Sequence, residues 1–355
     1  MSLSAFESAL FQVWLKTILL IAVALATGSF VFGFAPQTTE RSPAATAQNS
    51  ATSSQTDSVE LVDNLFNGTG GEKVDRSRAI SMLERLAVAG SSVAQTRLGD
   101  IYDKGDDVEQ DHKEAAKWYL KAAQQGESHA QYMLAALYEA GYGVELDEDE
   151  AKLWYRKSAD QGNADGQLYL ASMYRHGRGG EQDDVEAARW YRKAAQQDKV
   201  YAQYNLGVQY ERGEGVEKDE KKAVYWYRRA ADLGFFAAQN NLGSCYSKGM
   251  GVEKDEVEAV RLYHKSAEQG FAVAQLNLGN KYSDGIGVKE DKREAVRWYR
   301  KAADQGHVIA QFHLGDAYQH GYGVKRDLKQ AAAWYRKSAA QGDEDAKTRL
   351  KNLSN

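Results

Sequence analysis

Residues 202–234 read AQYNLGVQYERGEGVEKDEKKAVYWYRRAADLG, and this stretch decides the fold because the chain repeats its pattern end to end. The small residue that opens it has counterparts every 36 residues, so seven units cover residues 94–345. A single unit of this size cannot bury its own apolar face, whereas stacked units bury a continuous core. The repetition therefore predicts a solenoid, in which each unit packs against its neighbours.

The first half of each unit predicts an amphipathic helix. Position one is Ala or Gly, position five is always Leu and position nine is always Tyr, as at Ala202, Leu206 and Tyr210. Residues at i, i+4 and i+8 share one helix face. Position six is Gly or Ala, as at Gly207, which lets a second helix come close. Position twelve is always Gly, as at Gly213, and ends the helix where a left-handed residue is needed.

The second half of each unit predicts another helix, antiparallel to the first. Position eighteen is always Asp, as at Asp219, and an aspartate before a helix caps its free amide groups. Six units carry Glu or Gln three residues later, which resembles a capping box. Trp occurs in six units and Tyr follows in all seven, as at Trp226 and Tyr227. A glycine closes six units, and Asp198 is the exception. We therefore expect an all-α chain of helical hairpins.

The segments outside the repeats predict two caps and an N-terminal extension. Arg78 to Gly90 matches only a second helix, and Ala346 to Leu353 resembles a first helix. The complete predicted organisation is a short N-terminal segment at 1–16, a hydrophobic helix at 17–35, a flexible linker at 36–75, a capping half-repeat at 76–93, the seven repeats at 94–345 and a C-terminal cap at 346–355.

Residues 17–35 have no charge and are long enough to span a bilayer. They predict a transmembrane signal anchor, or a signal peptide that is cleaved after Ala26. The Ser-, Thr- and Ala-rich residues that follow bury too little apolar surface to order themselves, so they predict a tether. We expect a membrane-anchored protein with its repeats on the exported side, periplasmic or extracellular if bacterial, or secretion after cleavage.

Composition and missing motifs argue against several other functions. The net charge of −5 is unsuited to general nucleic-acid binding. One cysteine, Cys245, excludes an internal disulfide and a zinc site of several thiolates. The sequence has no His-Glu-x-x-His, Gly-x-Ser-x-Gly or Lys-Thr-Gly motif. We expect no catalytic residue, metal site, cofactor or small-molecule substrate. His313 and His320 are two helical turns apart, too far for a paired metal site.

The pattern A-Q-x-x-L-G-x-x-Y-x-x-G-x-G-V-x-x-D-x-x-x-A-x-x-W-Y-x-K-A-A-x-Q-G resembles the Sel-one-like repeat (SLR), a relative of the tetratricopeptide repeat. Residues 202–234 and 310–342 fit this pattern most closely. The resemblance implies a right-handed α/α solenoid whose members are adaptors and generally not enzymes. In such stacks the first helices line a concave groove, so the variable positions on these helices are the candidate binding residues.

Positions three and four supply the candidate site. Position three is unusually apolar for a face that meets water, which suggests a protein partner. Position four holds three consecutive asparagines, which form an amide ladder for a peptide backbone or else bond to the next repeat. The candidate ligand-binding residues are Asn205, Asn241, Asn277, Tyr132, Tyr204, Leu276 and Phe312.

The function expected from the sequence is a membrane-tethered scaffold that binds a protein or peptide on a preformed surface. A rigid surface binds without the cost of ordering itself first. Two alternatives stay open: an enzyme or enzyme subunit that acts on cell-wall or glycan material, and a cytosolic regulatory adaptor. Turnover of muropeptides would indicate the first alternative, and a protein that is not exported would indicate the second.

Overall fold

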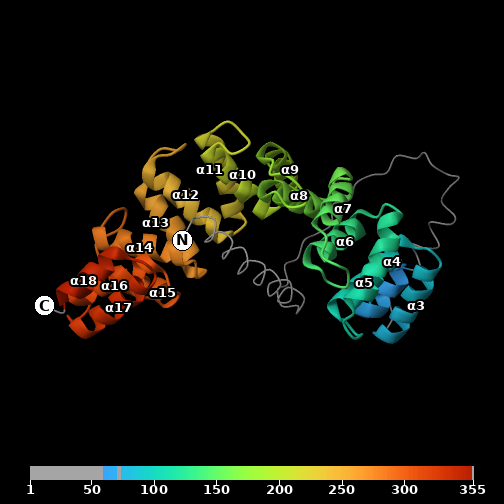
Figure 1. Ribbon diagram of the computed structural model, residues 1–355, viewed down its shortest axis with the longest axis horizontal. Helices are drawn as coiled ribbons and strands as arrows, with labels where there is room; N and C mark the ends of the chain where they lie inside the picture. Colours follow the sequence, from blue (N-terminus) through green and yellow to red (C-terminus); the bar gives the residue numbers. More distant parts are fainter. Residues whose placement is uncertain (1–58, 70–72, 354–355) are drawn as a thin grey trace. The chain divides into compact units, whose positions relative to one another are not determined.

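The computed structural model describes residues 59–69 and 73–353, and every regular element in these ranges is an α-helix (Figure 1). Consecutive helices pair into hairpins, and the hairpins pack one after another, so the predicted all-α solenoid is confirmed. None of the helices in the described part combines the length and the apolar character that a membrane span requires. The hydrophobic helix predicted at 17–35 lies outside the described residues.

Fourteen helices of 13 residues build the seven repeats. The first helices are α4 (Ser92–Lys104), α6 (Ser128–Ala140), α8 (Ala164–His176), α10 (Val200–Arg212), α12 (Phe236–Lys248), α14 (Ala272–Asp284) and α16 (Val308–His320). The second helices are α5 (His112–Gln124), α7 (Glu148–Asp160), α9 (Asp184–Gln196), α11 (Glu220–Asp232), α13 (Glu256–Glu268), α15 (Lys292–Asp304) and α17 (Leu328–Ala340).

The N-terminal end of the stack differs from the prediction. Residues 59–67 are helical, although the sequence predicts a flexible linker to residue 75. Val62 and Leu65 are buried in one cluster with residues of α3 (Arg76–Val88) and α4. This short helix therefore gives α3 a partner, so the end unit is a hairpin and not a lone helix. At the other end, α18 (Glu344–Leu353) packs on α17 and buries Ala346.

Glycines end the first helices and also let neighbouring repeats touch. Gly213 has φ of 75° and its amide donates to the Gln209 carbonyl at 2.8 Å. A Cβ atom on Gly215 would lie 1.9 Å from the Asp184 carbonyl oxygen in the preceding repeat. Only glycine allows this approach, so the second glycine of the turn is a contact between repeats. Asp107 replaces that glycine in the first repeat and keeps the left-handed conformation at φ of 63°.

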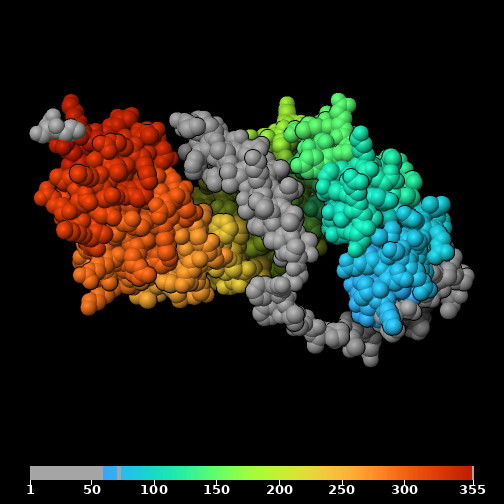
Figure 2. All heavy atoms as spheres, turned by 90° about the horizontal axis from the view of Figure 1, so that it is seen from below, coloured from blue at the N-terminus to red at the C-terminus, as the bar shows by residue number. Residues whose placement is uncertain are grey.

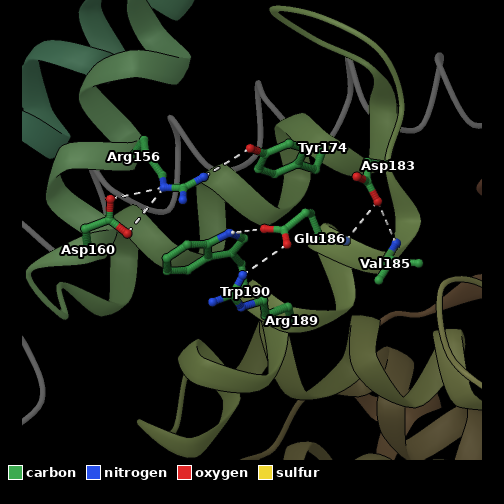
Figure 3. A network of polar contacts seen from close by, with 8 residues as sticks. All are labelled: Arg156, Asp160, Tyr174, Asp183, Val185, Glu186, Arg189 and Trp190. Atoms are coloured by element: carbon green, nitrogen blue, oxygen red, sulfur yellow. Dashed lines mark hydrogen bonds and ion pairs between the residues drawn. The ribbon is translucent and has the colours of Figure 1, made fainter.

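The aspartates at position eighteen cap the second helices, as predicted. Asp183 accepts hydrogen bonds from the amides of Val185 and Glu186, each at 3.0 Å (Figure 3). Glu186 in turn accepts from the Trp190 indole at 3.1 Å, so the cap is tied to the core (Figure 3). The same capping bond is made by Asp111, Asp147, Asp183, Asp219, Asp255, Asp291 and Asp327.

The Trp-Tyr pairs form the core, also as predicted. Trp190 is 1% exposed, and Tyr227 is fully buried against the helix that precedes it. A Cβ atom on Gly207 would lie 2.7 Å from the Tyr227 ring, which explains why position six is small. Arg156 links two repeats, since its guanidinium lies 5.2 Å from the Trp190 ring and donates to the Tyr174 hydroxyl (Figure 3). Repeats follow one another in sequence order along the described part (Figure 2).

Candidate functional site

The half-buried side chains of the first helices form what we call the first-helix face. Its members include Asp100, Tyr132, Tyr204 and Asn280. Core tyrosines of the second helices reach this face with their hydroxyl groups. Tyr119 donates to the Asp100 carboxylate at 2.7 Å, and Tyr299 donates to the Asn280 amide oxygen at 2.8 Å. Burial raises the pKa of Tyr299 to about 12, so its hydroxyl keeps its proton and acts as a donor. These bonds fix the polar side chains of the face before any partner arrives.

Position three is less open than the sequence predicts. Leu276 is only 6% exposed and lies in a core cluster with residues of α15 and α16, so it presents little surface to a ligand. Tyr132, Tyr204 and Phe312 are half-buried. The physical reason is that position three packs against position four of the next repeat: the rings of Tyr132 and Tyr169 are 5.6 Å apart.

Tyr132 belongs to a tyrosine cluster that joins two repeats. Its ring centroid is 6.1 Å from Tyr155, which stacks on Tyr169 at 5.5 Å. Burial raises the pKa of all three tyrosines, so each remains neutral. His129 borders the cluster, and the Asp100 carboxylate, which lies 3.8 Å from its ring nitrogen, raises its pKa. The cluster therefore offers hydroxyl groups and ring edges, with an imidazolium at its border when His129 is protonated.

Tyr204 and Phe312 lie in two further aromatic contacts. Tyr204 approaches Tyr227 at 5.9 Å and Phe235 at 5.2 Å. Phe312 packs on Tyr335 at 5.7 Å. These contacts bury one side of each ring, and both side chains remain half-buried on the first-helix face. Both therefore stay candidates for a partner contact.

The three asparagines do not form a ladder of free amides. Asn205 accepts a hydrogen bond from Arg175 of the preceding repeat at 3.0 Å. Asn277 donates to Asn240 of the preceding repeat at 2.9 Å, and Asn240 donates to Asn241 at 3.2 Å. The geometry therefore favours the alternative interpretation, in which position four helps to join adjacent repeats.

Asn277 nevertheless lines a polar cavity of about 210 Å³ on this face. In its wall, the Lys281 ammonium donates to the Ser247 hydroxyl at 2.7 Å and to the Glu256 carboxylate at 2.5 Å. Burial alone would raise the pKa of Glu256. Hydrogen bonds from Lys281, Lys254 and Ser247 outweigh that effect, so the pKa of this carboxyl lies below its ordinary value. The cavity residues are Ser247, Tyr263, Asn277, Asn280, Lys281, Asp284 and Ile286.

Other chemically active side chains have structural positions. Cys245 is 2% exposed, and burial raises its thiol pKa to about 12, which leaves little thiolate at neutral pH. His313 stacks on Tyr299, whereas His320 stacks on Tyr322, so the two histidines do not converge. Within residues 59–69 and 73–353, no cluster of three or more potential metal ligands occurs.

The sequence analysis missed a row of aromatic side chains where α10, α12 and α14 begin. We call Tyr201, Phe235, Phe236 and Phe271, together with the adjacent Leu233, the aromatic ridge. Successive ring centroids along it lie 5.0 to 5.1 Å apart. An alignment of the repeats could have pointed to this row, because Leu233 occupies a position where the other six units have glutamine.

The comparison with protein families gives the same architecture. The Sel1 repeat model matches eight consecutive segments, the first at residues 63–91 and the last at 308–343. The first match coincides with the short N-terminal hairpin, so the stack has one more repeat than the seven predicted. The seven full matches begin at residue 92, two residues before the predicted units.

Two solved structures are similar over most of the chain. The crystal structure of c5321, a protective antigen of uropathogenic Escherichia coli strains with an SLR fold, is 36% identical at a TM-score of 0.79. The match covers 86% of this chain and 66% of that chain, so this chain spans about two thirds of its length. A Sel1 repeat protein from Oxalobacter formigenes is 32% identical at a TM-score of 0.65, over 84% and 86% of the two chains.

No curated protein matches the chain significantly. Proteins with this repeat generally act as protein-interaction scaffolds, and the fold is typically not an enzyme. The repeat model covers the described stack almost from end to end, and both structural relatives are over 30% identical. The chain therefore belongs to the Sel1 repeat family.

Proposed function

We propose that this protein is a scaffold that binds a protein partner on its first-helix face. The observation that carries the proposal is the preformed order of this face. Tyrosine hydroxyls, carboxylates and amides are fixed by bonds within and between repeats, as in the pairs Tyr119–Asp100 and Asn277–Asn240. A partner therefore meets positioned donors, acceptors and half-buried rings without an ordering cost.

Site-specific photocrosslinking in the native host tests this proposal. A benzophenone side chain at Asn280 reports on the cavity of the first-helix face. The matched control is Arg297, whose side chain is 73% exposed on the second helix α15. We expect one stoichiometric protein product from Asn280 and none from Arg297. Equal products from both positions, or release of muropeptide fragments by the purified protein, would contradict a scaffold that uses this face.

The proposal includes export and membrane attachment through residues 17–35. The support is the uncharged run of 19 residues, followed by a polar segment before the first repeat. Cell fractionation with protease added to intact cells or spheroplasts tests it. We expect the repeats to sediment with membranes and to be cut only by protease on the exported side. A protected protein in the cytosolic fraction would instead support the cytosolic adaptor.

A further inference from the structure

A ladder of glutamine pairs runs through the turns between the second and first helices. In six repeats the glutamine after the second helix donates to the position-two glutamine of the same repeat, as Gln161 donates to Gln131 at 2.7 Å. The position-two glutamine also donates to a carbonyl of the preceding second helix, as Gln131 does to Ala123 at 3.1 Å. The ladder therefore satisfies buried amide groups along the stack.

The ladder is broken at one place. Leu233 stands where the donor glutamine belongs, and Gln203 is completely buried. Its Nε2 group still donates to the Ala195 carbonyl and to Asp198, but in the described part of the chain its Oε1 atom has no hydrogen-bond partner. By analogy with the other repeats, this acceptor points toward residue 233. Leu233 itself is 56% exposed.

A second irregularity occurs at the same edge of the stack. First helices elsewhere are capped by a side chain that accepts the amide of the third helical residue, as Asn163 does from Gly166 at 2.9 Å. The helices α10, α12 and α14 begin after Lys199, Phe235 and Phe271, which make no such bond. Three successive helix ends thus lack a side-chain acceptor, and each has a partial positive charge.

The aromatic ridge lies beside these ends, since Phe235 and Phe271 directly precede α12 and α14. Tyr201 contacts Phe235 at 5.0 Å, Phe236 contacts Phe235 at 5.1 Å, and Phe236 contacts Phe271 at 5.0 Å. Phe236 is 37% exposed. A single uncapped helix end is common. Here three successive ends lie beside a buried acceptor without a partner among the described residues and beside exposed apolar side chains. This edge of the stack therefore offers free backbone donors next to apolar surface.

We propose that the aromatic ridge is a docking site for an extended protein segment in which every third residue is acidic and the residues between are large and apolar. Carboxylates of the segment cap α10, α12 and α14, as the carboxylates of Glu127 and Asp343 do for α6 and α18 within the chain. Its apolar side chains cover Leu233 and Phe236. A backbone amide of the segment, or of the turn that it displaces, reaches Oε1 of Gln203. The inference rests on the proposed scaffold function and names a second surface with its partner class.

The spacing of the helix ends suggests the form of the segment. Phe235 and Phe271, the residues before α12 and α14, are joined through the Phe236 ring by centroid distances of 5.1 and 5.0 Å, so their rings lie at most about 10 Å apart. A polyproline II peptide has three residues per turn and rises about 3.1 Å per residue, so every third side chain lies on one face about 9 Å apart. A carboxylate at every third position therefore matches successive helix ends. The two intervening apolar side chains of each turn point to either side of that face, and one of them contacts the ridge.

A defined peptide tests the proposal on the full chain by fluorescence anisotropy. The probe is fluorescein-labelled Asp-Leu-Phe-Asp-Leu-Phe-Asp with blocked ends. Two control peptides replace every Asp with Asn, or every Leu and Phe with Ser. We expect saturable binding of the probe that weakens with added salt, and about tenfold weaker binding of each control, a difference of about 1.4 kcal/mol.

Three variants separate the contributions of the site. Lys199→Asn supplies a cap to α10 without touching a ring, Phe236→Ala removes apolar surface, and Leu233→Gln fills the Gln203 acceptor. We expect each to weaken probe binding several-fold. Two matched controls do not weaken binding: Asp165→Asn, which breaks the ion pair that Asp165 makes with Lys199 at 2.7 Å and leaves the Lys199 ammonium in place, and His307→Asn at the capped helix α16.

Several results would overturn the docking site. These are no saturable binding, equal binding of the Asn peptide, or unchanged affinity in all three ridge variants. Self-association of the wild type that Phe236→Ala abolishes in sedimentation would identify a second copy as the occupant instead. Binding to phosphatidylcholine vesicles that depends on Phe236 would identify a lipid surface. Crosslinking at Asn280 is independent of the ridge, so the scaffold proposal can survive when the docking site fails.

Discussion

At the scale of single residues, the glutamines of the repeat are structural residues of the interior, although their side chains are polar. Gln95 is 4% exposed and Gln203 is completely buried, although glutamine is usually a surface residue. A buried amide is tolerated when each of its groups is bonded, and the ladder provides those bonds. Leu233 removes one donor and leaves one acceptor unsatisfied, so this position tests the value of the ladder.

We expect Leu233→Gln to stabilise the protein by about 1 kcal/mol, because a buried unsatisfied acceptor costs about 1–3 kcal/mol and an exposed leucine contributes little. Urea unfolding followed by circular dichroism measures the change. The reverse substitution, Gln161→Leu, orphans Gln131 and should destabilise by a similar amount. A loss of stability in Leu233→Gln would show that the ladder does not account for the orphaned acceptor.

A second prediction concerns the small residue at position six. Gly207→Val places branched carbons in the space of the Tyr227 ring, where a Cβ atom alone would lie at 2.7 Å. Overpacking of this kind costs about 1–3 kcal/mol, so the midpoint of thermal unfolding should fall. Gly207→Ala should cost less, since Ala135 and Ala171 occupy this position in two other repeats. Equal midpoints for Val and wild type would refute the close contact.

The pH dependence of stability has a predictable sign at His313. Burial lowers its pKa, so the folded state binds a proton less readily than the unfolded chain. As pH falls below the ordinary histidine value, the unfolded state gains protons and His313 contributes a loss of stability. The midpoint of thermal unfolding should therefore fall less between about pH 7 and about pH 5 in His313→Gln than in the wild type.

His129 provides the opposite control. The Asp100 carboxylate, 3.8 Å from its ring nitrogen, raises its pKa, so its stabilising contribution is present at low pH and disappears as pH rises through the folded value. His129→Gln should therefore make acidification more harmful than in the wild type. The same slope for both variants would contradict these assignments.

At the scale of helices, each element is bounded by residues that the sequence displays. Left-handed glycines end the first helices, as Gly213 does, and aspartates begin the second helices. These effects act within one turn of the chain, so the pattern of residues predicts them. The helix at 59–67 was missed because its few apolar residues, such as Val62 and Leu65, look like linker until α3 buries them.

We expect Asp183→Ala to destabilise the protein by about 1 kcal/mol, because α9 loses the acceptor for two amides. Thermal and urea unfolding should give the same direction. Asp183→Asn retains an acceptor oxygen and is the matched control, with little expected loss. A binding role for the aspartate, such as a calcium site, would instead make Asn as harmful as Ala and would make stability respond to added calcium.

At the scale of the whole stack, the free energy of unfolding is approximately a sum of terms for single repeats and for the interfaces between adjacent repeats, because each repeat packs mainly on its neighbours. Deletion of residues 236–271 joins Phe235 to Ala272 and recreates the natural Phe271–Ala272 junction. We expect a folded protein with unchanged helicity per residue. Its urea dependence of unfolding should fall by roughly one eighth, because less surface is exposed.

A half-repeat deletion is the control for this experiment. Removal of residues 236–252 leaves α13 without its own first helix, so its buried face has no matching surface. This variant should aggregate or lose its cooperative transition. If both deletions fold equally well, the 36-residue hairpin is not the unit of cooperativity.

The repeat, the helical hairpin, the capping aspartates and the family can be predicted from the residue pattern, because these features depend on local geometry and on a period that recurs along the chain. Which variable residues are open depends on the packing between repeats. Leu276 is buried and Asn277 is bonded to the preceding repeat, since the surface that each helix exposes depends on how closely its neighbour packs. The orphaned acceptor of Gln203 likewise exists only where two turns meet, because a missing partner is visible only once the neighbours are in place.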